Sequence, residues 1–180
     1  MTQLTDQYLA DADRLTALLT SADAADWSAP SPCEGWSAAD VVDHVVDTQR
    51  DFFAQREADL GPRPTGTPDE VWAGHTDAVR RAVADDAFVT LEYDGYFGRT
   101  TVADTLARFY GFDLLVHHWD IARALGLDVT WDEAEMDRID TALDGFGEHL
   151  YGEGVCRPAL DVSPDAPRQT RLLARMGRAA

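Results

Sequence analysis

The sequence contains no lysine: all 15 basic residues are arginines, against 33 aspartates and glutamates. The formal net charge of −18 produces a surface that repels polyanions. This charge argues against nucleic acid and anionic membranes as partners. The same negative field favours cations, including metal ions.

Cysteine and long apolar runs are also scarce. Only Cys33 and Cys156 occur, and the N-terminal stretch MTQLTDQYLADADRL lacks the basic and then apolar character of a secretory signal. No apolar run approaches the length that spans a bilayer. We therefore expect a cytoplasmic protein with two reduced thiols and no membrane partner.

The motifs of several common enzyme classes are missing. There is no glycine-rich phosphate loop, no nucleophile elbow and no zinc-finger cysteine spacing. With 180 residues, 45% of them hydrophobic, the chain is long enough to bury a substantial core. No internal repeat or low-complexity linker divides it, so we expect a single domain over residues 1–180.

The apolar spacing predicts an all-α helical bundle with one small hairpin. Ser37 with Asp40, and Thr101 with Asp104, have the spacing of capping boxes that begin two of the helices. Asp94-Gly95, inside FVTLEYDGYFGRTTV, predicts a β-hairpin turn. Helices are expected over residues 4–20, 38–59, 68–85, from Thr101 to Gly126, and over 131–150, with a short amphipathic segment, QTRLLARMG, near the end.

The stretch FDLLVHHWD, residues 112–120, carries the most suggestive chemistry. At 100° per residue, Asp113 and His117 lie one turn apart on an inward stripe, whereas His118 points about a quarter-turn away. The full stripe comprises Val102, Leu106, Phe109, Asp113, His117, Asp120 and Ala124. Burying a carboxylate and an imidazole is costly unless they are paired. Two interpretations follow: a hydrogen-bonded structural pair, or two ligands of a metal ion.

His44 is the best candidate for a third ligand, since it lies at the flank of the apolar face of the helix over 38–59. Three N and O ligands from two helices leave coordination positions for water or substrate, as in catalytic metal sites. Such a set suits zinc, nickel or iron(II). Asp120 has two interpretations, as a hydrogen-bond partner of a ligating histidine or as an ion-pair partner of Arg123. For Cys33, just upstream of a helix N-terminus, we favour a packing role over a reactive thiol.

Two segments taken together, WSAPSPCEGWSAADVVDHVV and DLLVHHWDIARALG, resemble the DinB-like metal-binding bundles. The resemblance is closest to the actinobacterial branch related to the metal-binding domain of mycothiol-dependent maleylpyruvate isomerase, and it covers most of the chain. It implies a DinB-like four-helix bundle with a small β-hairpin and a short C-terminal extension. It also implies one divalent metal, zinc first and nickel or iron as alternatives, held by His44, Asp113 and His117. The isomerase has glutamate at the position of Asp113, and many relatives have histidine there.

The resemblance implies a metal-dependent enzyme that uses a low-molecular-weight thiol, such as mycothiol or bacillithiol, for S-transfer, conjugation or isomerisation of a small-molecule substrate. The isomerase also has a C-terminal domain that helps form its active site. We do not expect such a domain within 180 residues, so maleylpyruvate isomerisation itself is not expected. No residue stands out as a general acid or base. The alternatives are a non-catalytic bundle that binds a metal or small ligand, and a purely structural bundle. DinB-like bundles often pair, which makes a homodimer one option.

Overall fold

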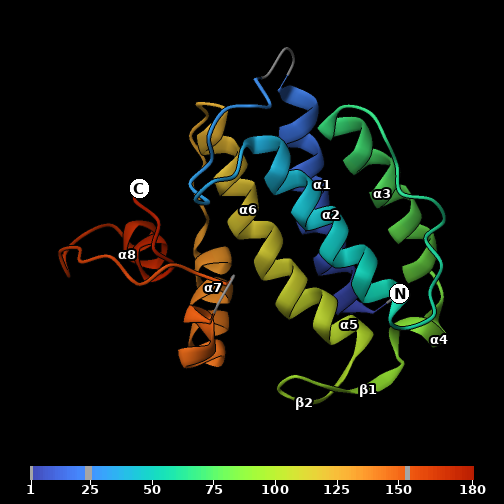
Figure 1. Ribbon diagram of the computed structural model, residues 1–180. Coiled ribbons are helices and arrows are strands. Elements are labelled where there is room, and N and C mark those ends of the chain that lie inside the picture. Colours follow the sequence, from blue (N-terminus) through green and yellow to red (C-terminus); the bar gives the residue numbers. More distant parts are fainter. Residues whose placement is uncertain (1, 23–25, 153–154) are drawn as a thin grey trace. The chain divides into compact units, whose positions relative to one another are not determined.

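The computed structural model describes residues 2–22, 26–152 and 155–180 (Figure 1). The chain divides into two compact units, Met1–Leu127 and Asp128–Ala180, which are described separately. Among the described residues, no helix has both the length and the apolar character needed to cross a membrane. Cys33 and Cys156 are not joined in a disulfide.

The first unit is a four-helix bundle with a small hairpin, which confirms the predicted all-α fold (Figure 1). Its helices are α1 (Gln3–Ser21), α2 (Ala38–Ala54), α3 (Pro68–Val83) and a composite of α5 (Val102–Thr105), the π-helical η1 (Leu106–Tyr110) and α6 (Gly111–Ala124). Helix α1 contacts α3 and α6, and α2 contacts the same two helices, so the four form a ring. The largest fully buried side chains of this unit are Tyr8, Leu15, Phe53, Trp72, Leu106, Leu114 and Ile121.

Local capping determines where the helices of the site begin. The Ser37 hydroxyl accepts a hydrogen bond from the Asp40 backbone N–H at 3.2 Å, and the Asp40 carboxylate accepts one from the Ser37 N–H at 2.8 Å. This capping box starts α2 where the sequence predicts. The helix ends at Ala54, five residues before the predicted end at 59. Glu57 has a φ of 58°, in the left-handed region, which an α-helix cannot continue through.

The hairpin has a different turn from the predicted one. Strands β1 (Glu92–Gly95) and β2 (Gly98–Thr101) are antiparallel. Asp94 pairs with Arg99 and Gly95 with Gly98, so the turn lies at residues 96–97 and the prediction of a turn at Asp94-Gly95 is wrong. The glycine that allows the chain to reverse is Gly98, with a φ of 107°. Phe88 and Val89, the first two residues of the stretch FVTLEYDGYFGRTTV, do not join the hairpin and instead end the short helix α4 (Asp86–Val89).

The π turn of η1 interrupts the helix that leads into the site. A π-helical turn takes one more residue than an α-helical turn, so the residues before and after it do not follow a single 100° wheel. Phe109, predicted in the inward stripe, is 45% exposed, whereas Tyr110 is 7% exposed. The position predicted for Phe109 is therefore wrong. Tyr110 takes the inward place and donates a hydrogen bond to the Thr48 carbonyl at 3.1 Å.

The second unit contains α7 (Glu133–Phe146), a 3₁₀ turn η2 (Gly147–Tyr151) and α8 (Arg168–Arg175). The predicted helix over 131–150 is thus an α-helix followed by a 3₁₀ turn. Arg168 and Arg175 of α8 reach carboxylates of α7, with Arg168 2.7 Å from Asp137 and Arg175 2.5 Å from Asp140. These ion pairs and the buried Leu172 and Leu173 hold α8 in the unit.

Candidate metal centre

His44, Asp113 and His117 lie together inside the first unit. His44 comes from α2, and the other two lie one turn apart on α6. One potential ligand atom from each residue falls within 4.8 Å of the others. The imidazoles of His44 and His117 meet edge to face with centroids 5.2 Å apart, and Nε2 of His117 is 3.3 Å from Oδ1 of Asp113. The fold thus brings together the three residues that the sequence selects from two helices.

The other ring nitrogen of His117 is hydrogen-bonded to Asp120. Nδ1 of His117 lies 3.0 Å from Oδ2 of Asp120, whose side chain is fully buried. With the Nδ1 proton directed at this carboxylate, Nε2 faces Asp113 and His44. The Cys33 thiol donates to the same oxygen of Asp120 at 3.3 Å. The sequence left Asp120 as either a hydrogen-bond partner of a histidine or an ion-pair partner of Arg123. The structure supports the hydrogen bond to His117.

Burial and charge act differently on the two histidines. Burial lowers the pKa of His44 below 6.5, although the nearby Asp113 carboxylate acts in the opposite direction. A neutral imidazole is the form that binds a metal. Burial also acts to lower the pKa of His117, but the charge of Asp113 and the hydrogen bonds that His117 makes with Asp113, Asp120 and Cys33 outweigh it and raise this pKa well above 6.5. The position between the two carboxylates therefore favours positive charge.

The surroundings of the Asp113 carboxylate indicate whether these residues suit a metal ion. Its Oδ2 atom is buried and has no hydrogen-bond partner among the described residues. Leaving a buried carboxylate oxygen without a partner is costly, and a bound cation would remove that cost. Two imidazoles and one carboxylate are ligands of zinc, nickel and iron(II). The three residues therefore fit a divalent cation.

Residues around the three donors complete the site. The Trp36 ring packs on His44 with centroids 4.8 Å apart and an interplanar angle of 49°. Cys33, His117 and Asp120 form a second group of potential donor atoms within 4.8 Å, and it shares His117 with the first. Sequence reasoning missed the position of Cys33, because 87 residues separate it from Asp120. His118 belongs to neither group; burial, with a smaller effect of the Arg14 charge, lowers its pKa to about 4.

A family model described as the mycothiol maleylpyruvate isomerase N-terminal domain matches residues 8–122. The chain belongs to this family. The match lies within the first unit and includes His44, Asp113 and His117. It confirms the resemblance seen in the sequence.

Two curated relatives come from Mycobacterium tuberculosis: the uncharacterized protein Rv0738 of strain ATCC 25618 / H37Rv and the uncharacterized protein MT0763 of strain CDC 1551 / Oshkosh. Each is 29% identical to this chain over 174 residues, covering 92% of both chains. This similarity extends well beyond the residues that the family model matches. No solved structure matches the chain significantly.

Proposed function

We propose that this protein binds a divalent metal and acts as a metal-dependent enzyme with a low-molecular-weight thiol such as mycothiol. The observation that carries the proposal is the convergence of His44, Asp113 and His117 within 4.8 Å, together with the unpartnered Oδ2 of Asp113. The name of the matched family supplies the link to mycothiol.

In this proposal, His44 and His117 hold the cation through imidazole nitrogens, and Asp113 holds it through its carboxylate. A bound divalent cation lowers the pKa of a thiol or water that it holds, so a nucleophile forms near neutral pH. Asp120 keeps Nε2 of His117 directed at the centre through its hydrogen bond to Nδ1. Trp36 limits the movement of the His44 ring by packing on it. The reactions that such a centre suits are S-transfer to an electrophile, thiol conjugation and thiol-assisted isomerisation.

The metal site is tested by elemental analysis of protein purified without a histidine tag. We expect about one divalent ion per chain in the wild type, and loss of that ion in His44→Ala and His117→Ala. His118→Ala is the matched control, because it removes the adjacent imidazole, which lies outside the donor group. Circular dichroism shows whether each variant is folded. Full metal occupancy in folded His117→Ala would overturn the site.

Activity is tested separately with metal-loaded protein, mycothiol and a panel of electrophiles. Product formation above the uncatalysed rate, lost in His117→Ala, supports an enzyme. A stoichiometric metal without turnover across the panel would favour the non-catalytic metal-binding alternative.

A further inference from the structure

The imidazole of His117 belongs to two groups of possible metal ligands, one at each ring nitrogen. Nε2 faces Asp113 and His44, the other donors of the candidate metal centre. Nδ1 lies 3.0 Å from Oδ2 of Asp120, and the Cys33 sulfur belongs to the same group, in which all donor atoms lie within 4.8 Å of one another. Among the described residues, these are the two groups of at least three histidine, cysteine, aspartate or glutamate side chains that come this close.

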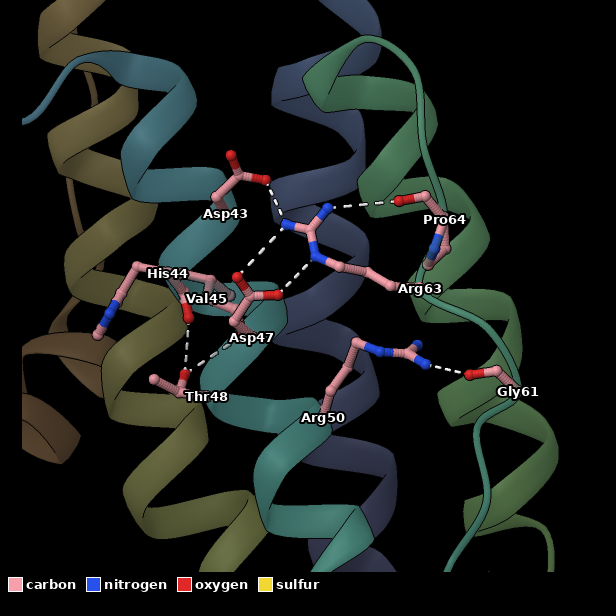
Figure 2. Close-up of polar contacts among 9 residues, drawn as sticks. All are labelled: Asp43, His44, Val45, Asp47, Thr48, Arg50, Gly61, Arg63 and Pro64. Atoms are coloured by element: carbon pink, nitrogen blue, oxygen red, sulfur yellow. Dashed lines mark hydrogen bonds and ion pairs between the residues drawn. The ribbon is translucent and has the colours of Figure 1, made fainter.

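The carboxylates of α2 nearest to His44 are engaged elsewhere. Arg63 forms ion pairs with Asp43 and Asp47, and the His44 imidazole points away from this guanidinium (Figure 2). His44 therefore contributes to the first group alone. The donors for another ion lie on the Nδ1 side of His117.

The spacing of the second group is close to that of a tetrahedral metal site. The Cys33 sulfur is 3.3 Å from Oδ2 of Asp120, and Nδ1 of His117 is 3.0 Å from the same oxygen. Metal–sulfur bonds of about 2.3 Å and metal–nitrogen or metal–oxygen bonds of about 2.0–2.1 Å separate such donors by about 3.3–3.6 Å at tetrahedral angles. Small outward movements of these side chains would therefore admit an ion.

The second group differs from the first in its chemistry and its access to solvent. A thiolate is a soft ligand, and the first group, with two imidazoles and one carboxylate, has none. His117 and Asp120 are buried, whereas Cys33 is partly exposed, so an ion can approach from the side of Cys33. Occupying this group costs the hydrogen bonds that Asp120 accepts from Cys33 and His117. An ion that binds sulfur strongly is needed to offset that cost.

We propose that Cys33, His117 and Asp120 form a second metal site, selective for thiophilic divalent ions such as cadmium, that competes with the candidate centre. When such an ion binds, the Cys33 thiol releases its proton to solvent, and Nδ1 of His117 becomes a ligand. A neutral imidazole has one N–H and one lone pair, so the ring proton then lies on Nε2. This N–H donates to Oδ1 of Asp113, 3.3 Å away. Nε2 is then no longer a ligand, and the thiophilic ion empties the first position.

Cadmium titration of the full chain tests the second site, because a cadmium–thiolate bond gives a charge-transfer band in the ultraviolet. We expect about one cadmium ion per chain and a thiolate band in the wild type. Cys33→Ser should lose the band, whereas Cys156→Ser, which removes the other cysteine, should keep it. Serine retains a hydroxyl that can donate to Asp120, and circular dichroism shows whether each variant is folded.

Cadmium affinity is compared in the His44→Ala background, in which the first position lacks a ligand. His44→Ala should bind added cadmium with its thiolate band, because His44 lies outside the second group. His44→Ala/Cys33→Ser should bind cadmium at least about 100-fold more weakly, since losing a direct ligand costs more than losing an outer hydrogen-bond partner.

Competition is measured in cobalt(II)-loaded wild type, whose d–d absorption bands report the first position. Added cadmium should abolish these bands as the thiolate band appears, and Cys33→Ser should need more cadmium for the same loss. Cobalt bands that persist beside a full thiolate band would show both positions occupied at once and would overturn the competition.

The second site shares only His117 with the candidate centre and does not depend on catalysis, so the two proposals can fail separately. Normal cobalt bands without a cadmium–thiolate band would overturn the second site alone. A thiolate band without any cobalt bands would overturn the candidate centre and support the second site. A thiolate band that survives in Cys33→Ser and disappears in Cys156→Ser would assign the ion to Cys156 and overturn the second site.

Discussion

Nδ1 of His117 and Oδ2 of Asp120 lie 3.0 Å apart, and Asp120 is fully buried. A buried carboxylate in this position fixes the orientation and the tautomer of the imidazole, so that Nε2 is presented to His44 and Asp113. The 3.3 Å hydrogen bond from the Cys33 thiol helps to hold the carboxylate in place. Asp120 is thus a positioning residue for the candidate metal centre.

We predict that Asp120→Asn lowers the metal affinity by about 10- to 100-fold without abolishing binding, because the amide lacks the negative charge that makes His117 a stronger ligand. Competition with a chromophoric chelator measures this affinity. Asp94→Asn, on the exposed hairpin, is the control and should bind metal like the wild type. Unchanged affinity in Asp120→Asn would show that the 3.0 Å hydrogen bond has no influence on the metal.

Asp113→Asn and Asp113→Glu should separate charge from side-chain length. The asparagine variant keeps the shape but lacks the anionic oxygen that now has no hydrogen-bond partner, so we expect metal binding to be lost at equimolar metal. The glutamate variant keeps the charge and should retain affinity within about tenfold, since Asp and Glu oxygens are both zinc ligands. Isothermal titration calorimetry measures both. Equal binding by both variants would contradict a role for the carboxylate.

His75 should make the unfolding free energy depend on pH. It is completely buried, and this burial, with a smaller effect from the charge of Arg50, lowers its pKa to about 3 from the ordinary value of 6.5. Between those values the unfolded chain takes up a proton that the folded protein does not, so stability is lost as the pH falls below about 6.5. For this one group the loss between pH 7 and pH 5 is at most about 2 kcal/mol.

Urea unfolding at both pH values, followed by tryptophan fluorescence, measures this loss. His75→Gln cannot titrate in this range and should show a smaller difference between pH 7 and pH 5 than the wild type does. An identical difference in the two proteins would rule out His75 as a source of the pH dependence.

Gln49 joins two other buried polar groups. Its Oε1 accepts hydrogen bonds from the Tyr8 hydroxyl at 2.6 Å and from Nε2 of His75 at 2.9 Å. Tyr8→Phe removes one donor but leaves Gln49 Oε1 bonded to His75, so we expect a loss of about 1 kcal/mol. Gln49→Leu leaves both donors without this partner and should cost about 2–4 kcal/mol. Urea unfolding tests the order, and a greater loss in Tyr8→Phe would contradict this description of the network.

Features that depend on a few neighbouring residues could be predicted from the sequence. The capping box of Ser37 and Asp40 begins α2 at the predicted residue, because both hydrogen bonds close within three positions of the chain. The 100° wheel placed Asp113 and His117 on one face correctly, because α6 is regular over that stretch. The same wheel failed at Phe109, where the π turn adds a residue.

The sequence by itself determined the helical class and an Asp–His pair facing inward, since helix periodicity and caps are short-range properties of the chain. His44 could be proposed as a third ligand from its position on the face of its helix. Its contact with His117 depends on how α2 packs against α6. Tertiary structure alone decided that Cys33 meets Asp120 and that Arg63 lies on the aspartates of α2, because long-range contacts depend on how helices and loops pack. The spacing of four aspartates in the sequence places them on one face of α2 beside His44, and the packing of the bundle determines which residues surround that face. The four are Asp40, Asp43, Asp47 and Asp51.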